Sequence, residues 1–248
     1  AGNFTEETLS YTLDTISPVV QITSPTATHT NSSTITVEGT VTETNLSELR
    51  VNGVVATVSG GNFTAEVTFS GEGSKQITAV ATDLAGNTGQ AERQIILDLT
   101  APVISDLSPS DGSWTRNTVA VVTGTLSEAD VQVTVAGEAA TVTGQTFSVQ
   151  VSLPTEGENF LPIVATDLAG NTSSVDLTLN RDTAQPVLSV STLPEYTNID
   201  NLGVSGTVED ASLISFKINN VEIPVVSGQF SHSLSLLEGS NEVSIIAE

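Results

Sequence analysis

The chain has 248 residues, of which six are Lys or Arg and 29 are Asp or Glu, so its formal net charge at pH 7 is −23. A chain of this charge repels phosphate backbones and anionic lipid surfaces, which excludes nucleic-acid binding and argues against membrane contact. The sequence contains no cysteine, which excludes disulfides and thiol chemistry. Carboxylate oxygens favour Ca²⁺ over softer metals, so hard cations are the ligands that this composition attracts.

The predicted elements are strands from the first residues onward. A strand is expected over residues 4–13, and seven more cover residues 18–23, 33–42, 46–52, 54–58, 63–69, 76–82 and 90–97. Asn52-Gly53 predicts a two-residue hairpin turn, because both central residues of such a turn take positive φ. The strand over residues 63–69 alternates apolar and polar side chains, which indicates one buried face.

The same pattern recurs every 84 residues, a step kept by Asp14, Asp98 and Asp182 and by Pro18, Pro102 and Pro186. Seven alternating strands in such a unit predict an all-β fold, with tandem immunoglobulin-like β-sandwiches. We expect repeats over residues 15–98, 99–182 and 183–248, the third without its last strand. Residues 1–14 would be the last strand of a preceding repeat or a donor strand for a neighbouring subunit.

Two motifs carry a family resemblance. Asp83-Leu-Ala-Gly-Asn87, followed by Asp98-Leu-Thr-Ala-Pro102, resembles the tandem immunoglobulin-like repeats of large bacterial surface adhesins and biofilm proteins, and similar motifs follow at residues 167–171 and 182–186. The resemblance implies an extracellular protein at the bacterial cell surface that acts as a non-enzymatic spacer, stalk or fibre-forming segment. Its expected partners are neighbouring repeats or further copies joined head to tail, and surface glycans or proteins.

Acidic residues occupy equivalent positions in the repeats: the linker, the loop between the second and third strands, and the loop before the last strand. In an immunoglobulin-like sandwich these three positions gather at one end. They are Asp14, Glu43 and Asp83 in the first repeat, Asp98, Glu128 and Asp167 in the second, and Asp182 and Asp210 in the third.

Converging carboxylates repel one another without a counter-ion, and Ca²⁺ takes six to eight oxygen ligands. We therefore predict Ca²⁺ sites that stiffen the joints between domains. The alternative is that each aspartate accepts hydrogen bonds from the backbone of its own turn.

Two other functions remain open at this point. Residues 1–13 would complete the third sandwich of the next subunit if the chain is a self-polymerising filament subunit. The lone Trp114 would instead stack on a sugar if the chain is a carbohydrate-binding accessory module of a secreted glycoside hydrolase, although packing of Trp114 against a neighbouring domain is also expected.

Enzymatic activity is not expected, because the acidic clusters recur with the repeat and no Gly-x-Ser-x-Gly motif is present.

Overall fold

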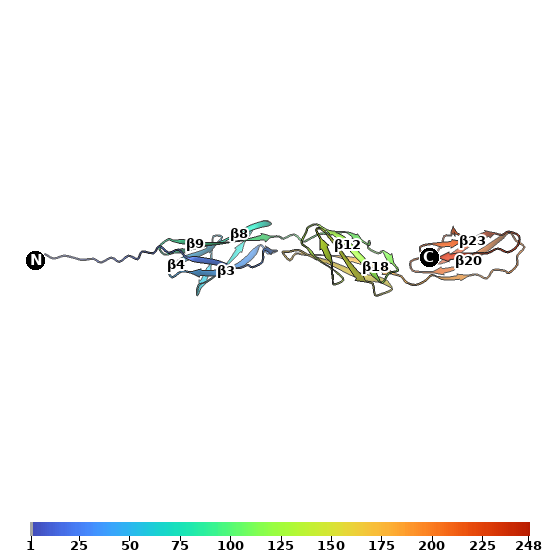
Figure 1. The fold of residues 1–248 in the computed structure, drawn as a ribbon, viewed down its shortest axis with the longest axis horizontal. Coiled ribbons are helices and arrows are strands. Elements are labelled where there is room, and N and C mark those ends of the chain that lie inside the picture. Colours follow the sequence, from blue (N-terminus) through green and yellow to red (C-terminus); the bar gives the residue numbers. More distant parts are fainter. Residues whose placement is uncertain (1) are drawn as a thin grey trace.

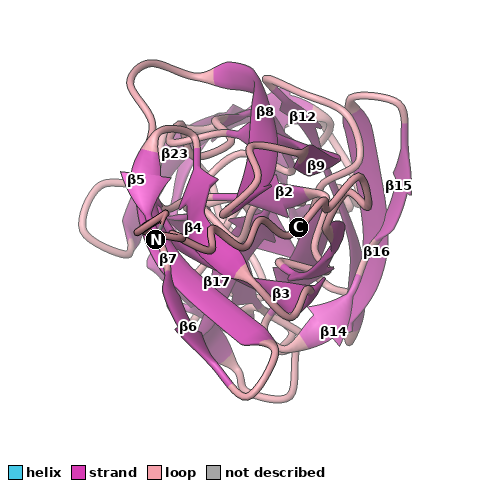
Figure 2. Ribbon diagram, turned by 90° about the vertical axis from the view of Figure 1, so that its left-hand side faces the viewer, coloured by secondary structure: helices cyan, strands magenta, loops and turns pink. Residues whose placement is uncertain are grey.

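The computed structural model describes residues 2–248, which form strands and loops only. Figure 1 shows three sandwiches that follow one another in a row, with residues 2–16 extending from one end. The end-on view in Figure 2 likewise shows strands joined by loops. Within the described range, no helix that could span a membrane is found. The predicted all-β fold with tandem immunoglobulin-like sandwiches is confirmed.

The first sandwich consists of two facing sheets. One has the order β1 (Val19–Ser24), β3 (Thr34–Thr42), β7 (Asn62–Thr68) and β6 (Thr57–Ser59). The other has the order β2 (His29–Thr30), β9 (Thr88–Leu97), β8 (Gly73–Asp83), β4 (Leu46–Val51) and β5 (Val54–Val55).

The second sandwich repeats this arrangement. Its first sheet has the order β10 (Ile104–Ser108), β12 (Val119–Leu126), β16 (Thr146–Ser152) and β15 (Thr141–Thr143). Its second sheet has the order β11 (Trp114–Thr115), β18 (Thr172–Arg181), β17 (Gly157–Thr166), β13 (Gln132–Val135) and β14 (Glu138–Ala139).

The third sandwich has smaller sheets. One has the order β19 (Val187–Val190), β20 (Asn201–Glu209) and β23 (Gln229–Ser235), and the other has the order β22 (Val221–Glu222), β21 (Phe216–Ile218) and β24 (Ile245–Ala247). Within residues 2–248, β24 has no strand on its outer side, where β8 has β9 and β17 has β18.

The structure differs from the predicted strands in three places. The strand expected over residues 54–58 is two strands, because the chain changes sheets at buried Ala56: β5 pairs with β4, whereas β6 pairs with β7. The short strand β2, which pairs in parallel with β9, has too few residues for a periodic signal and was not predicted. Residues 4–13 form no strand, because no other segment within residues 2–248 pairs with them, and Ala1 lies outside the described residues.

The turns and the alternation follow the sequence closely. Asn52 and Gly53 have φ values of 46° and 84°, as the predicted hairpin turn requires. Phe63, Ala65 and Val67 in β7 are buried, while the residues between them are exposed. The inward face of this strand therefore forms part of the core, as predicted.

A glycine and a phenylalanine pair across two strands in the core of each sandwich. Gly39 lies opposite Phe63, Gly124 opposite Phe147, and Gly206 opposite Phe230. A Cβ on Gly124 would lie 2.5 Å from Cε1 of Phe147, so any side chain there would collide with the ring. The glycine makes room for the largest side chain of the core.

Candidate metal centres at the domain junctions

Asp98 connects the first sandwich to the second. Its N–H donates to the carbonyl of Thr30 in β2 over 3.0 Å, which ties it to the first sandwich. Its Oδ1 accepts a hydrogen bond from the N–H of Thr100 over 3.1 Å, so the side chain closes a local turn in the linker. Asp14 makes the equivalent turn with the N–H of Ile16 over 3.0 Å.

The structure brings two of the predicted sets together. One carboxylate oxygen from each of Asp98, Glu128 and Asp167 lies within 4.8 Å of the other two, and the same holds for Asp14, Glu43 and Asp83. We call these the second and the first acidic trio. Asp83 is only 2% exposed and Asp167 only 8%. None of the three salt bridges among residues 2–248 involves a member of either trio, so no basic side chain neutralises them.

A bridging asparagine fixes each trio to its linker. Asn171 donates from its N–H and its Nδ2 to the two oxygens of Asp167, both over 2.8 Å, and its Nδ2 also donates to the carbonyl of Asp98 over 2.9 Å. Asn87 makes the same three bonds to Asp83 and to the carbonyl of Asp14. The repeated sequence motif includes both asparagines, but it does not reveal their role, because each donates to a linker carbonyl 73 residues away in the chain.

The hydrogen bonds set the charge state of the buried aspartates. Burial acts to raise the pKa of Asp167, but bonds from the side chain and backbone of Asn171 and from the amides of Gly170 and Ala169 outweigh it and lower the pKa. The balance of the same contributions lowers the pKa of Asp83. Both aspartates are therefore held as carboxylates.

The pKa of Glu128 shifts in the opposite direction. Burial, followed by the nearby charges of Asp98 and Asp167, raises the pKa of Glu128. This repulsion is what three close carboxylates produce when nothing positive lies between them. The aspartates also accept hydrogen bonds from the backbone of their own turns, as the alternative to a metal site predicts. The two roles are compatible, because a carboxylate oxygen has two lone pairs and can accept a hydrogen bond and bind a cation at the same time.

The sequence comparisons identify the repeat. Residues 18–99, 102–183 and 186–248 each match the family model for domain B of glucodextranase. The chain belongs to this family. It is also 35% identical over 104 residues to bacillopeptidase F of Bacillus subtilis, which covers 42% of this chain and 7% of that protein. The PII-type proteinase of Lactococcus lactis subsp. cremoris is 26% identical over 269 residues, with 91% of this chain and 14% of the proteinase covered.

Solved structures show weaker likenesses. The fibronectin(III)-like modules of Clostridium thermocellum CbhA have a TM-score of 0.43 at 17% identity, covering 65% of this chain and 93% of that one. The Escherichia coli adhesin FdeC has a TM-score of 0.41 at 12% identity, covering 93% and 91%. Likenesses at this level do not indicate what the chain binds.

The third domain-B repeat has a different junction. Ser212 donates from its Oγ to Asp182 over 2.7 Å and from its N–H to Asp210 over 2.8 Å. A serine therefore joins these two predicted site residues, and no group of three acidic side chains forms around them within residues 2–248.

A second glutamate holds each linker from the opposite side and was not predicted. Glu72, in the loop before β8, accepts hydrogen bonds from the N–H of Leu99 over 2.8 Å and from Oγ1 of Thr100 over 2.7 Å. Glu156 likewise accepts hydrogen bonds from the N–H and from Oγ1 of Thr183. These bonds, with the side-chain bond from threonine first, lower the pKa of both glutamates. The signal was present, since Glu72 and Glu156 lie 84 residues apart, each before a glycine.

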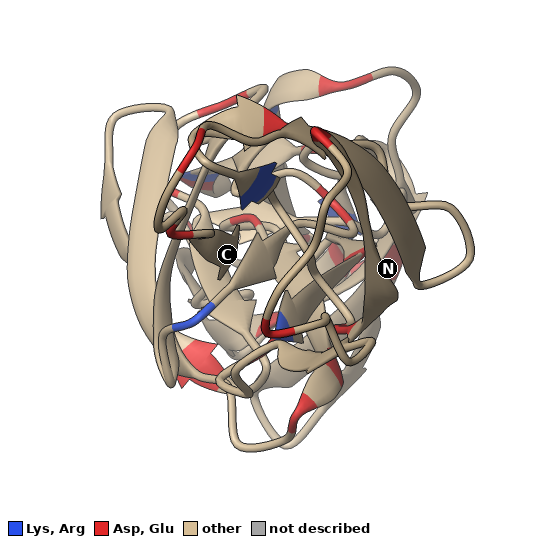
Figure 3. Cartoon of the chain, turned by 90° about the vertical axis from the view of Figure 1, so that its right-hand side faces the viewer, with Lys and Arg blue, Asp and Glu red and all other residues tan. Residues whose placement is uncertain are grey.

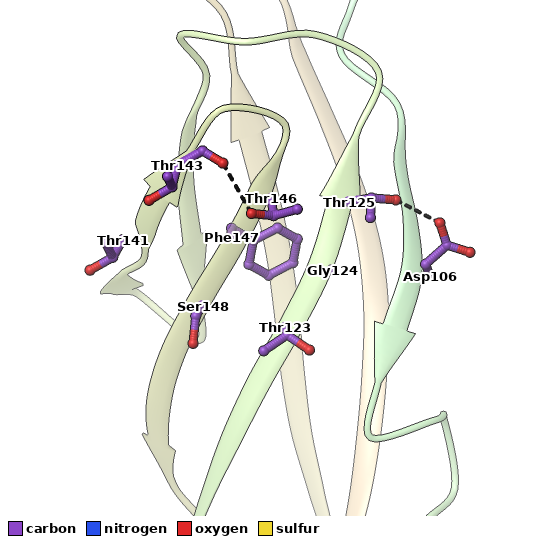
Figure 4. A pocket seen from close by; sticks show the side chains of 9 residues that line it. All are labelled: Asp106, Thr123, Gly124, Thr125, Thr141, Thr143, Thr146, Phe147 and Ser148. Carbon is purple, nitrogen blue, oxygen red and sulfur yellow. Dashed lines mark hydrogen bonds between the residues drawn. The ribbon is translucent and has the colours of Figure 1, made fainter.

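One surface hollow of the second domain-B repeat lies between β12, β15 and β16. The hollow in Figure 4 measures about 360 Å³ and is lined mainly by hydroxyl groups, with Asp106 as its one ionisable residue. Thr125 donates to Asp106 over 2.7 Å, and Thr146 donates to the carbonyl of Thr143 over 3.0 Å. Figure 3 shows acidic residues scattered over many loops and strands and only a few basic ones.

Trp114 lies where the second and third sandwiches meet. It is 48% exposed and lines a cleft of about 800 Å³ together with Arg116 of the second sandwich and Leu213 and Ile214 of the third. The tryptophan thus faces the neighbouring domain across a cleft.

Proposed function

We propose that the chain is a non-enzymatic spacer, stalk or fibre-forming segment of a secreted bacterial surface adhesin, and that Ca²⁺ bound by its acidic trios stiffens the domain junctions. The row of domain-B repeats in Figure 1 supports the structural role, because each sandwich adds length along one axis. The observation that carries the metal proposal is the approach of three carboxylates to within 4.8 Å of one another, with no salt bridge to any of them among the described residues.

The position of the second trio explains why an ion there would act mechanically. Asp98 belongs to the linker, whereas Glu128 and Asp167 belong to loops of the second sandwich. The first sandwich is close as well, since a Cβ on Gly170 would lie 3.6 Å from Nδ2 of Asn31. An ion that binds all three carboxylates would hold the linker against the second sandwich and restrict bending at the joint.

Calorimetric titration with Ca²⁺ tests this proposal. We expect two sites with a Kd on the order of 0.1–1 mM, the range of weak extracellular calcium modules. Glu128→Gln is the sharpest variant, because Glu128 accepts no hydrogen bond within the described residues and its loss removes only charge. It should weaken one site about tenfold and leave the other unchanged.

Glu66→Gln is the matched control, because it removes one exposed carboxylate outside both trios. It should titrate like the parent chain. Absence of heat above buffer in the parent chain, or equal titrations for Glu128→Gln and the control, would refute the metal proposal. Small-angle scattering should show a narrower range of chain lengths with Ca²⁺ than with a chelator.

The carbohydrate-binding alternative stays a prediction. Its support is the half-exposed ring of Trp114 beside Arg116 in a cleft, since sugars stack on such rings. A glycan array on which binding is saturable and is lost in Trp114→Ala would favour it over the spacer role.

A further inference from the structure

The linker between the first and second sandwiches, residues 98–103, is bonded to both of them. On the side of the first sandwich, the first linker residue donates its N–H to the carbonyl of Thr30. The next two residues bond to a side chain: Oε1 of Glu72 accepts from the N–H of Leu99 over 2.8 Å and from Oγ1 of Thr100 over 2.7 Å. The first sandwich therefore holds the first half of the linker.

The second sandwich holds the other half. Ser173 donates from its Oγ to the carbonyl of Pro102. Val103 donates its N–H to Oγ of Ser127 over 2.8 Å, and the N–H of Ser127 donates to the carbonyl of Val103 over 3.0 Å. A linker bonded in this way along most of its length is part of the folded structure and not a free hinge.

Glu72 has a special place among these contacts. Within the described residues, it is the only side chain of the first sandwich that forms a hydrogen bond with the linker. Lys75, near the start of β8, donates from its Nζ to the carbonyl of Ser70 over 2.9 Å and to that of Glu72 over 3.3 Å. The lysine thus fixes the loop from which Glu72 reaches the linker.

The same contact recurs at the linker between the second and third sandwiches. The N–H groups that bond to Glu72 and Glu156 belong to Leu99 and Thr183, which lie 84 residues apart (183 − 99). The hydroxyl group comes from Thr100 in the first case but from Thr183 itself in the second. The glutamate therefore keeps both bonds although the threonine has moved by one position.

We propose that Glu72 and Glu156 are positioning residues that set the angle at the domain joints, by fixing each linker to the preceding sandwich without a metal ion. This rests on the proposed spacer role, since a stalk keeps its length only if its joints resist bending. The second acidic trio acts on the opposite side, where Asp98 meets loops of the second sandwich. A joint is no stiffer than the weaker of its two attachments, so an ion in that trio does not replace Glu72.

Pulsed electron paramagnetic resonance tests the proposal, because the native chain has no cysteine and two labels can be placed at will. Thr64→Cys and Ser148→Cys put spin labels on equivalent exposed positions of β7 and β16. In chelator, Glu72→Ala should broaden the distribution of label distances relative to the labelled parent, because it removes both bonds. Glu72→Gln should keep the parent distribution, because its amide oxygen can accept the same two bonds.

Glu66→Ala is the matched control, since it truncates an exposed glutamate of the same sandwich away from the linker. It should keep the parent distribution, and its urea unfolding should coincide with that of Glu72→Ala, which separates a loose joint from a loose fold. Thr100→Val removes one bond from the side of the linker without changing the first sandwich, and it should broaden the distribution less than Glu72→Ala.

Saturating Ca²⁺ should leave the Glu72→Ala distribution broad. This measurement depends on the proposed metal sites, whereas the comparison in chelator does not, so the two proposals fail separately. Equal distributions for Glu72→Ala and Glu66→Ala in chelator, a Glu72→Gln distribution as broad as that of Glu72→Ala, or a return of Glu72→Ala to the parent distribution with Ca²⁺ would overturn the proposal.

Discussion

The second and third sandwiches are built from the same repeat, yet within residues 2–248 their buried cores differ in size. Fifteen buried residues form the core cluster of the second, and seven form that of the third. The second core includes residues of β18, which pairs with β17 over its full length and contributes buried Leu177 and Leu179.

This difference shows how much one strand contributes to a small sandwich. β18 supplies hydrogen-bond partners for β17 and apolar cover for the residues beneath it. It also gives β11 its only partner, and the third sandwich has no strand equivalent to β11 within the described residues. Within the described residues, β24 pairs on one side only, and Val243, Ile245 and Ala247 are half-buried.

The largest expected effect comes from truncating equivalent core residues in the two sandwiches. Leu161→Ala should destabilise the second sandwich by about 2–5 kcal/mol, because Leu161 is buried and leaves a cavity. Val243→Ala should destabilise the third by about 1 kcal/mol or less, because Val243 is already half-exposed. Urea unfolding followed by the fluorescence of Trp114 reports on the second sandwich, and amide hydrogen exchange reports on the third.

Equal costs for the two substitutions would contradict the comparison of the two cores.

A smaller effect is expected where the two sandwiches do not differ. Gly124→Val and Gly206→Val should each destabilise their sandwich by about 1–3 kcal/mol, because both glycines lie against a phenylalanine ring. A Cβ on Gly206 would also lie 2.1 Å from the carbonyl oxygen of Ser189. Gly203→Val, in the same strand, is the control, since a Cβ there meets nothing within 4 Å. Thermal unfolding should show Gly203→Val as neutral or slightly stabilising, and a cost equal to that of Gly206→Val would be inconsistent with the ring contact.

The smallest effect concerns pH at the junction between the first and second sandwiches. The pKa of Asp167 is lowered in the folded chain, so its stabilising contribution is complete above about pH 4 and is lost as the pH falls further. The pKa of Glu128 is raised, so its ionisation costs stability as the pH rises above about 4.3.

Two variants separate these contributions in chelator. Asp167→Asn should unfold at a lower urea concentration than the parent at neutral pH and should lose part of the acid sensitivity. Glu128→Gln should unfold at a higher urea concentration than the parent at neutral pH. A Glu128→Gln chain less stable than the parent there would contradict the repulsion within the second trio.

The sequence was sufficient for the repeat, the strand content and the composition of the acidic trios. The 84-residue period shows in single residues such as Asp98 and Pro102, and alternation along Phe63, Ala65 and Val67 identifies a buried face. Knowledge of where loops gather in an immunoglobulin-like sandwich then places Glu128 near Asp167. These features are local or periodic, so they can be read without the fold.

Other features were decided by tertiary contacts. The pairing of Gly124 with Phe147, the bond from Asn171 to the carbonyl of Asp98, and the capture of the linker by Glu72 each join residues far apart in the chain. Within the described residues, β17 has ten residues and pairs on both sides, whereas β24 has three and pairs on one side. A strand is stable only with a partner, and the sequence of a strand does not say which partner is present.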